Sequence, residues 1–251
     1  MSEYIVVKRD GAILELVIAR TKKKNALNVA MYRALSDAID EAVGDVKIRT
    51  ILLRGSDGCF CAGNDLADFA SGNGLPEIKR FMQTLLTCPK PVVVAVEGAA
   101  IGIGATLLLH ADLVYASGSA TFHLPFVGLG LCPEYASSYL LPRMAGHLKA
   151  SELLLLGEPF GAELAKTIGM VNEIVDNPVD LAKAQCAKLA KLPPKAVRNT
   201  KALLKVTTQA GIEQAVNAEI DLFIAGLQGP EFAEAATAFF EKRPTDFSSF
   251  E

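Results

Sequence analysis

The chain has 251 residues, of which 51% are hydrophobic and 21% are charged, and its formal net charge is −3. This length suffices for one buried core, and the small net charge argues against nucleic acid as the main partner. No apolar run is long enough to span a bilayer, so we expect no membrane partner either.

The cysteines and histidines predict reduced thiols and no metal site. Five cysteines, an odd number at irregular spacing, are typical of a cytoplasmic protein. Cys59-Phe60-Cys61 is too tight for the usual zinc spacing, and the three histidines lie far apart in the sequence.

The N-terminal residues predict a β-hairpin followed by a helix. Residues 4–9 and 12–19 alternate apolar and polar side chains around Asp10-Gly11. Asn28 can cap a helix whose apolar residues recur at helical spacing up to Val43. Lys22, Lys23 and Lys24 precede it; such a run is usually a solvated loop, and its alternative role is to bind a phosphate-bearing ligand.

Two predicted strands end in glycine-containing turns. Residues 50–54 lead into residues 55–66, and the apolar run 92–96 leads into Gly98, Gly102 and Gly104, after which a helix begins. The first N–H groups of a helix have no partner within it, so two such turns can place two donors around one oxygen, as in an oxyanion hole. Ordinary structural turns, with Asp65 as a helix cap, are the alternative. A dinucleotide-binding turn fits poorly, because Leu107 stands where its last glycine belongs.

Glu134 is the second candidate for chemistry. A helix at 75–87 and a strand at 113–116 precede it, and an apolar loop then leads through Pro133 to Glu134 and a helix from Tyr135. A lone glutamate after proline is most often an acid of the first helical turn. The alternative is a base whose carboxyl pKa is raised by apolar surroundings.

The C-terminal part is predicted to be helical. After helices at 150–156 and 161–167 and a strand at 170–175, helices are expected at 179–192, 195–207, 211–227 and 230–241. We therefore divide the chain into a core, 1–194, and a helical region, 195–251. Either a partner subunit or the chain's own core must cover one apolar stripe, formed by Ile212, Ala215, Val216, Ile220, Phe223, Ile224 and Leu227.

Several motifs in this order resemble the crotonase (enoyl-CoA hydratase/isomerase) superfamily. They are Lys24-Asn25-Ala26-Leu27-Asn28, then residues 60–66 (FCAGNDL), then residues 98–104 (GAAIGIG). Residues 161–175 and 239–244 also fit, so the resemblance covers nearly the whole chain.

The resemblance implies an α/β fold, a spiral of ββα units followed by C-terminal helices that trimerise. The expected assembly is a homotrimer or a dimer of trimers. The implied substrate is an acyl-CoA thioester, with no further cofactor, whose carbonyl oxygen accepts from the backbone N–H groups of Ala62 and Ile103. The implied CoA contacts are Lys22, Lys24, Ala26, Leu27, Ala62, Asp65, Leu66 and Lys242. The resemblance also places Arg243, with Lys242, near the CoA phosphates and adenine.

The sequence departs from the hydratase pattern at both catalytic glutamates. Thr106 stands at the first position and Phe126 at the second. Glu134 instead matches the single catalytic glutamate of peroxisomal-type Δ3,Δ2-enoyl-CoA isomerases, with Phe122, Phe126 and Leu131 expected around the acyl chain. The alternatives are a thioester hydrolase, a weak hydratase, or a non-catalytic member that binds acyl-CoA or a protein. Glu134 argues against the last, since a binding module has no need of a carboxylate there.

Overall fold

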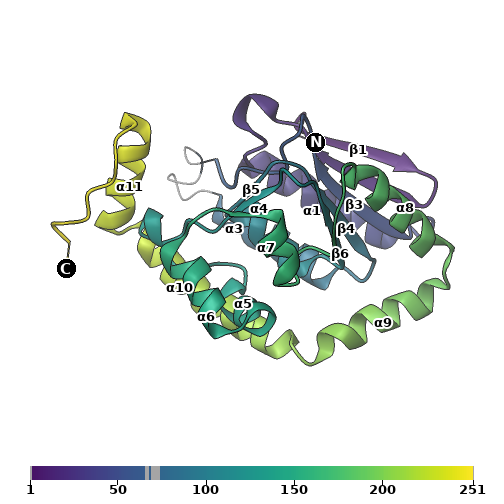
Figure 1. Ribbon diagram of the computed structural model, residues 1–251. Helices are drawn as coiled ribbons and strands as arrows, with labels where there is room; N and C mark the ends of the chain where they lie inside the picture. The colour runs from purple at the N-terminus through teal and green to yellow at the C-terminus, as the bar shows by residue number, and fades with distance from the viewer. Residues whose placement is uncertain (1, 66–67, 69–73, 251) are drawn as a thin grey trace.

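The computed structural model describes residues 2–65, 68 and 74–250 (Figure 1). A six-stranded sheet lies at its centre, with the order β1-β2-β3-β4-β6-β9. Its strands are β1 (Ile5–Asp10), β2 (Ile13–Ile18), β3 (Thr50–Gly55), β4 (Val92–Val96), β6 (Leu113–Ala116) and β9 (Glu173–Ile174). Among the described strands of this sheet, β1 and β2 pair antiparallel and the others pair parallel, which confirms the hairpin predicted around Gly11. Every residue of β4 is buried, as expected of a parallel strand covered on both faces.

A second, three-stranded sheet was not predicted from the sequence. It consists of β5 (Ala99–Ile101), β7 (Thr121–His123) and β8 (Phe160–Gly161), in that order. A strand of the large sheet, β4 or β6, is followed at once by a strand of the small sheet, β5 or β7, and then by helical turns. This repeat is the ββα unit expected from the resemblance.

The helices cover both faces of the large sheet (Figure 1). On one face α1 and α3 pack against the main core, and on the other Ala182 and Cys186 of α8 contact Leu52 and Val93. The helices are α1 (Val29–Gly44), α3 (Leu75–Thr87), α4 (Ile103–Thr106), α5 (Ser137–Ala145), α6 (His147–Ser151), α7 (Ala162–Thr167), α8 (Pro178–Lys191), α9 (Pro194–Val206), α10 (Gln209–Leu227) and α11 (Pro230–Glu241). Short helical turns are η1 (Thr21–Lys23), η2 (Leu107–His110), η3 (Val127–Leu129) and η4 (Glu152–Leu156).

Two predicted elements are shorter than expected. The strand expected at 170–175 is reduced to β9, because the N–H groups of Met170 and Val171 donate to Ala165 O and close the end of α7 instead. The helix expected to follow Glu134 directly begins only at Ser137. The predicted cap of α1 is confirmed, since Asn28 Oδ1 accepts from Met31 N at 2.9 Å.

The apolar stripe of α10 folds back onto its own chain. Ile212 packs with Ala136 and Leu140, and Phe223 joins the main core. The chain's own core thus covers these two residues, whereas Ala215, Val216, Ile220, Ile224 and Leu227 are half-buried, and covering by a partner subunit stays a prediction. Other large apolar side chains of α9 and α10 are exposed, namely Leu203, Leu204, Val206 and Leu222.

Figure 1 shows α9 running along the edge of the molecule from α8 to α10, with α11 and the C-terminus beyond. Lys201 anchors α9 to the sheet, since its Nζ donates to Lys90 O at 2.7 Å and to Asp112 Oδ2 at 2.6 Å. Within the described residues, no helix combines the length and the hydropathy needed to cross a membrane.

Candidate active site

The two glycine-containing turns meet, as the sequence predicts. Cys61 N donates to Ala99 O and Ile101 N donates to Cys61 O, both at 2.9 Å, so the exit of β3 lies beside β5. A Cβ atom on Gly104 would lie 2.6 Å from Cys61 O, closer than real contacts allow. Glycine is therefore required at position 104 for the first turn of α4 to approach the other turn.

The first predicted oxyanion donor requires correction. The N–H of Ala62 already donates to Lys24 O at 3.1 Å, so Ala62 is not a free donor. Asn64 lies opposite Leu27, but the residues on either side of Asn64 make the hydrogen bonds of this pairing. Leu27 N donates to Gly63 O, and Asp65 N donates to Leu27 O. Within the described part of the chain, the N–H groups of Asn64 and Ile103 donate to no backbone carbonyl. Ile103 owes this freedom to its place as the first residue of α4.

Glu134 is a buried carboxyl group with few polar neighbours. It is 7% exposed, and the hydroxyl of Thr106, itself fully buried, donates to Glu134 Oε1. Burial raises the pKa of Glu134 to about 8; the hydrogen bond from Thr106 opposes this rise, and the charge of Glu219 adds to it. Because α5 begins three residues later, Glu134 is not an acid of its first turn. The structure confirms that this carboxyl is buried with a raised pKa, and its role as a base stays a prediction.

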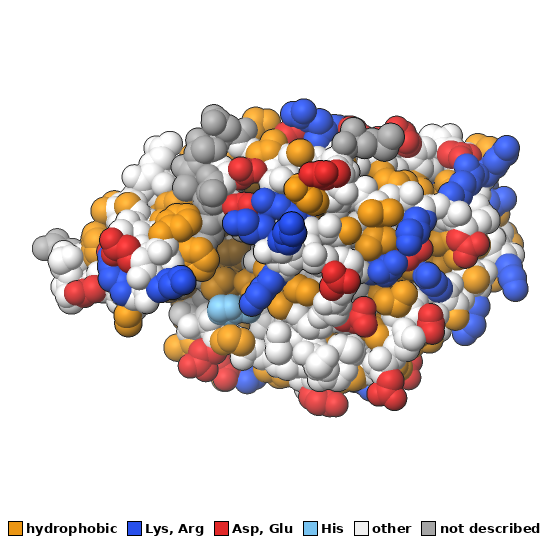
Figure 2. Space-filling view, turned by 90° about the horizontal axis from the view of Figure 1, so that it is seen from above, with side chains coloured by type: hydrophobic (Ala, Val, Ile, Leu, Met, Phe, Trp, Pro, Cys, Tyr) orange, Lys and Arg blue, Asp and Glu red, His pale blue; other side chains and the backbone are white. Residues whose placement is uncertain are grey.

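Glu134 opens into a pocket with about 400 Å³ of empty volume. Its described lining comes mainly from α3 and α10 and consists of Asn64, Leu75, Ile78, Lys79, Met82, Glu134, Ile220, Phe223 and Ile224. A neighbouring pocket shares Asn64, Leu75 and Ile78 and continues to Leu27, Tyr32 and Asp65. Through these shared residues the two pockets form one groove from Leu27 to Glu134. Figure 2 shows a hollow in the surface seen from above, with hydrophobic side chains in its depth and basic ones at its rim.

The side chains expected around the acyl chain lie deeper than this lining. Phe122, Phe126 and Leu131 are buried in the main core, and the rings of Phe122 and Phe160 stack with centroids 5.6 Å apart. Their part in binding the acyl chain stays a prediction. The apolar residues of α3 and α10 were missed, because their helical spacing alone gives no sign of a ligand.

Comparisons with known proteins lead to the family that the sequence motifs resemble. The family model described as enoyl-CoA hydratase/isomerase matches residues 8–249. The chain belongs to the enoyl-CoA hydratase/isomerase family. Its fold is the crotonase fold of the structural neighbours: the crystal structure of an enoyl-CoA hydratase/isomerase from Pseudoalteromonas atlantica has 39% identity and a TM-score of 0.94, and covers 98% of this chain and 100% of that one.

Relatives within the family carry different reaction names. A probable enoyl-CoA hydratase of Rhodobacter capsulatus is 38% identical over 93% of this chain and 93% of its own length. Enoyl-CoA delta isomerase 2 of Rattus norvegicus is 34% identical over 97% of this chain, and the chain spans 65% of that protein's length. Membership of the family therefore does not decide the reaction, which must be argued from the site.

Asn64 is a site residue whose side chain was not singled out from the sequence. The hydroxyl of Tyr32 donates to Asn64 Oδ1 at 2.5 Å, and burial raises the pKa of Tyr32 well above its ordinary value, so Tyr32 keeps its proton. This hydrogen bond fixes the amide and leaves Nδ2 as the donor of that side chain. The signal was present in the motif, where Asn64 follows the glycine of the turn.

The basic loop, which carries Lys22, Lys23 and Lys24, is fixed beside the glycine-containing turn that follows β3. Buried Asn25 accepts from Arg20 N at 2.9 Å, and its Nδ2 donates to Ser56 O at 3.1 Å and Cys59 O at 2.6 Å. Lys22 and Lys24 are exposed next to it, while Ala26 is half-buried and Leu27 is buried in the groove. CoA binding by these residues remains a prediction; of the four, only Leu27 lines the groove.

Asp65 is engaged within the chain. Its carboxylate pairs with Arg20 Nη1 at 2.7 Å, and Arg20 Nη1 also donates to Ala26 O at 3.1 Å. The ion pair holds Arg20 and Asp65 together, and the role of Asp65 as a helix cap stays a prediction, because residues 66–67 lie outside the described residues. The predicted CoA contact at Leu66 lies outside the described residues.

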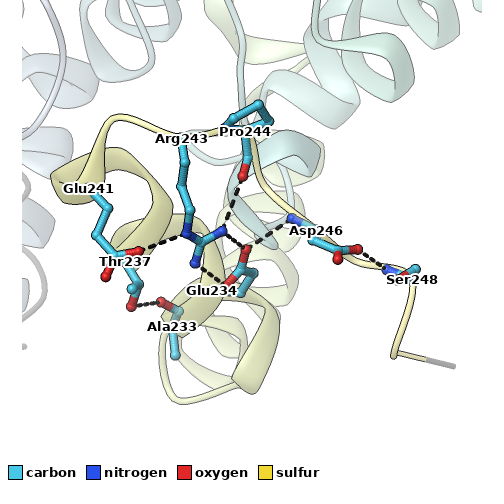
Figure 3. Close-up of polar contacts among 8 residues, drawn as sticks. All are labelled: Ala233, Glu234, Thr237, Glu241, Arg243, Pro244, Asp246 and Ser248. Atoms are coloured by element: carbon cyan, nitrogen blue, oxygen red, sulfur yellow. Dashed lines mark hydrogen bonds and ion pairs between the residues drawn. The ribbon is translucent and has the colours of Figure 1, made fainter.

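The C-terminal cations differ in their surroundings. Figure 3 shows Arg243 between Glu234, Glu241 and the carbonyl of Pro244. Its Nη2 lies 2.8 Å from Glu234 Oε2, and its Nε lies 2.7 Å from Glu241 Oε2. The charge of Arg243 is therefore compensated within the chain, whereas exposed Lys242 lies at the left-handed end of α11. Of the two cations, Lys242 is the better candidate to meet a phosphate.

No group of three or more His, Cys, Asp or Glu side chains in the described part of the chain could hold a metal ion.

Proposed function

We propose that the protein is a Δ3,Δ2-enoyl-CoA isomerase that moves the double bond of a 3-enoyl-CoA thioester to the 2 position. The observation that carries this proposal is the single carboxylate of the pocket. Among its described lining residues only Glu134 carries a carboxyl group, and Thr106 and Phe126 occupy the two positions where a hydratase has glutamates. Hydration needs one group to activate water and another to protonate carbon, but isomerisation needs only one.

The proposed reaction is a proton transfer in two steps. Glu134 removes a proton from C2, and the electrons of that C–H bond enter the conjugated system, giving a dienolate with its negative charge on the thioester oxygen. The protonated Glu134 then gives its proton to C4, the double bond forms between C2 and C3, and the carbonyl is restored. Glu134 ends ionised as it began, and neither water nor an oxidant is consumed.

The surroundings of Glu134 suit this role. A carboxylate of ordinary pKa is a weak base, and the burial that raises the pKa of Glu134 to about 8 brings it closer to the strength needed at carbon. The apolar side chains of Met82, Ile220 and Phe223 line the same pocket and limit access of water to the dienolate.

The two free backbone donors are proposed to hold the thioester oxygen. The N–H groups of Asn64 and Ile103 come from the two turns that the Cys61–Ala100 pairing holds together. Donors fixed in place before the reaction stabilise the charge that develops on the oxygen without reorganisation. In this scheme Asn64 replaces Ala62 as the first donor, and Ile103 is kept as predicted.

The proposal also covers the binding of the CoA part of the substrate and the oligomeric state of the protein. The CoA part extends along the groove past Leu27 towards Lys22 and Lys24, whose charges would meet its phosphates. We further propose that the exposed apolar side chains of α9 and α10 lie between subunits of a trimer or a dimer of trimers. Lys242 is proposed to reach the phosphates as well.

The deciding experiment compares two substrates. A 3-enoyl-CoA is supplied and formation of the conjugated 2-enoyl thioester is followed; in parallel, 2-enoyl-CoA is supplied and its hydration and its hydrolysis to free CoA are measured. The proposal predicts fast isomerisation and little turnover in the other two reactions. Hydration or hydrolysis faster than isomerisation would overturn it, and binding without any turnover would make the protein an acyl-CoA binder.

A further inference from the structure

The turn that follows Glu134 has an uncommon backbone. Tyr135 and Ala136 both adopt φ near +57°, in the left-handed region that favours glycine, and α5 begins immediately afterwards at Ser137. Two such residues in succession persist only where surrounding contacts enforce them. Their conformation determines where the backbone of Glu134 lies relative to the pocket.

Glu219 of α10 supplies the contacts on one side of this turn. Its Oε2 accepts from Ala136 N at 2.6 Å, and its Oε1 accepts from Ser138 N at 3.0 Å and from the Ser138 hydroxyl. Ala136, at the N-cap of α5, has no side chain that could accept these hydrogens, so a carboxylate 83 residues along the chain takes that place. Burial raises the carboxyl pKa of Glu219, and the hydrogen bonds from Ser138 and Ala136, which favour the ionised form, oppose that rise.

Other elements hold the carbonyl side of the same turn. His110 Nε2 donates to Tyr135 O at 2.7 Å, and burial lowers the pKa of His110 to about 4, so the ring is neutral. The Tyr135 hydroxyl donates to Met82 O at 2.7 Å, and Ser137 donates to Glu134 O through both its N–H and its hydroxyl. Glu219 is thus the described side chain that holds the N–H groups of the turn.

We infer that Glu219 is a positioning residue for proton transfer by Glu134, an inference that rests on the proposed isomerase function. Glu219 does not line the pocket and touches no reacting atom. It fixes the left-handed turn that directs Glu134 into the pocket, and it connects the catalytic loop to α10, the same helix that lines the acyl side of the pocket with Ile220 and Phe223. One helix therefore shapes the pocket and holds the base.

The charge of Glu219 gives this role a signature in the pH dependence. The groups that face the two carboxylates are the Thr106 hydroxyl from α4, the Tyr32 phenol from α1, the Tyr135 phenol, the Cys132 thiol, the Ser138 hydroxyl and Lys79 from α3. Burial raises the pKa of both phenols and of the thiol, so these three stay neutral near pH 7. The negative charge of Glu219 raises the pKa of Glu134, and removing that charge must lower it.

The test uses Glu219→Gln, which keeps the size of the side chain and removes its charge. We expect kcat for a 3-enoyl-CoA to fall on the order of 10²-fold, because a displaced catalytic group costs about that much, while KM changes less than about twofold. The acidic limb of the kcat profile should move to lower pH. Glu213→Gln, an exposed residue of the same helix, is the matched control and should leave kcat, KM and the profile as in the wild type.

A second variant separates geometry from charge. Glu219→Asp keeps the charge but withdraws the carboxylate, so kcat should fall while the acidic limb stays near its wild-type pH. If Glu219→Gln does not fold, Glu219→Asp carries the test. A folded variant of either kind with wild-type kcat would overturn the positioning role, and so would a Glu219→Gln profile whose acidic limb does not move.

A direct titration of Glu134 tests the role of Glu219 independently of the reaction that the protein catalyses. NMR titration of ¹³C-labelled glutamate should show a lower pKa for Glu134 in Glu219→Gln than in the wild type, whatever reaction the protein catalyses. If the wild type does not isomerise 3-enoyl-CoA, the proposed function fails while this titration still decides whether Glu219 acts on Glu134. An unchanged titration would count against the link between the two carboxylates.

Discussion

Replacing Glu134 by glutamine keeps the shape of the side chain and removes the proposed base. The substitution leaves the other groups of the site in place: Thr106, the pocket lining from α3 and α10, and the N–H groups of Asn64 and Ile103. We therefore expect KM to change little and kcat to fall about 10²–10⁴-fold, the range for a positioned acid–base group. This loss corresponds to about 3–5 kcal/mol in the activation free energy.

The same substitution should change how stability depends on pH. The carboxyl pKa of Glu134 rises from 4.5 to about 8 on folding, so the folded state holds its proton over a range in which the unfolded chain releases it. A raised carboxyl pKa contributes stability below the unfolded value, and this contribution is lost as pH rises through the folded value. The rise of the pKa from 4.5 to about 8 sets an upper limit of about 5 kcal/mol for the stability lost between these two pH values. Glu134→Gln should lack this loss and should be more stable than the wild type at pH 9.

The assay follows the 2-enoyl thioester formed from 3-enoyl-CoA, with urea unfolding of the same preparations at pH 5 and pH 9. Glu158→Gln, an exposed substitution, serves as the control. For the wild type, kcat/KM should rise with pH towards a plateau above pH 8, since the ionised form of Glu134 is the base. A Glu134→Gln variant that isomerises as fast as the wild type would refute the reasoning.

Three further predictions concern the rest of the molecule. Neutralising Lys22 and Lys24 with glutamine should raise KM for acyl-CoA and weaken its dependence on salt, and unchanged values of both would return these lysines to the solvated loop. Sedimentation at micromolar concentration should give a trimer or a larger assembly, and Leu204→Lys should dissociate it; a monomeric wild type would contradict the proposed interface. Gly104→Ala should cost about 1–3 kcal/mol in unfolding free energy and lower kcat, because the added Cβ would lie 2.6 Å from Cys61 O; wild-type stability and kcat would contradict the required close approach.

Much of the fold could be predicted because its long elements carry strong periodic signals. The hairpin around Gly11, helix α3 and the four C-terminal helices were expected close to their observed positions. The small sheet was not, because strands of two or three residues are too short to show alternation, and pairing with segments far along the chain determines them.

In the candidate site too, features that depend on nearby residues could be predicted, whereas contacts between residues far apart in the sequence could not. Glu134 and the meeting of the two glycine turns could be predicted, because a glutamate in an apolar loop and glycine clusters after strands are local features. The correction at Ala62 could not be predicted, because its N–H donates to Lys24 O across a contact between two loops. Asn64 is then the free donor of this turn. Likewise Glu219 lies 83 residues from the turn it caps, and no pattern in α10 distinguishes it from an ordinary helical glutamate.

The most direct test of the single-base claim follows the proton itself. 3-Enoyl-CoA carrying two deuterium atoms at C2 is converted in ordinary water, and deuterium at C4 of the 2-enoyl product is measured by mass spectrometry and NMR. If buried Glu134 removes the proton from C2 and returns it to C4, a substantial share of the product should carry deuterium at C4. Product formed with only protium at C4 would contradict transfer by one shielded carboxyl group.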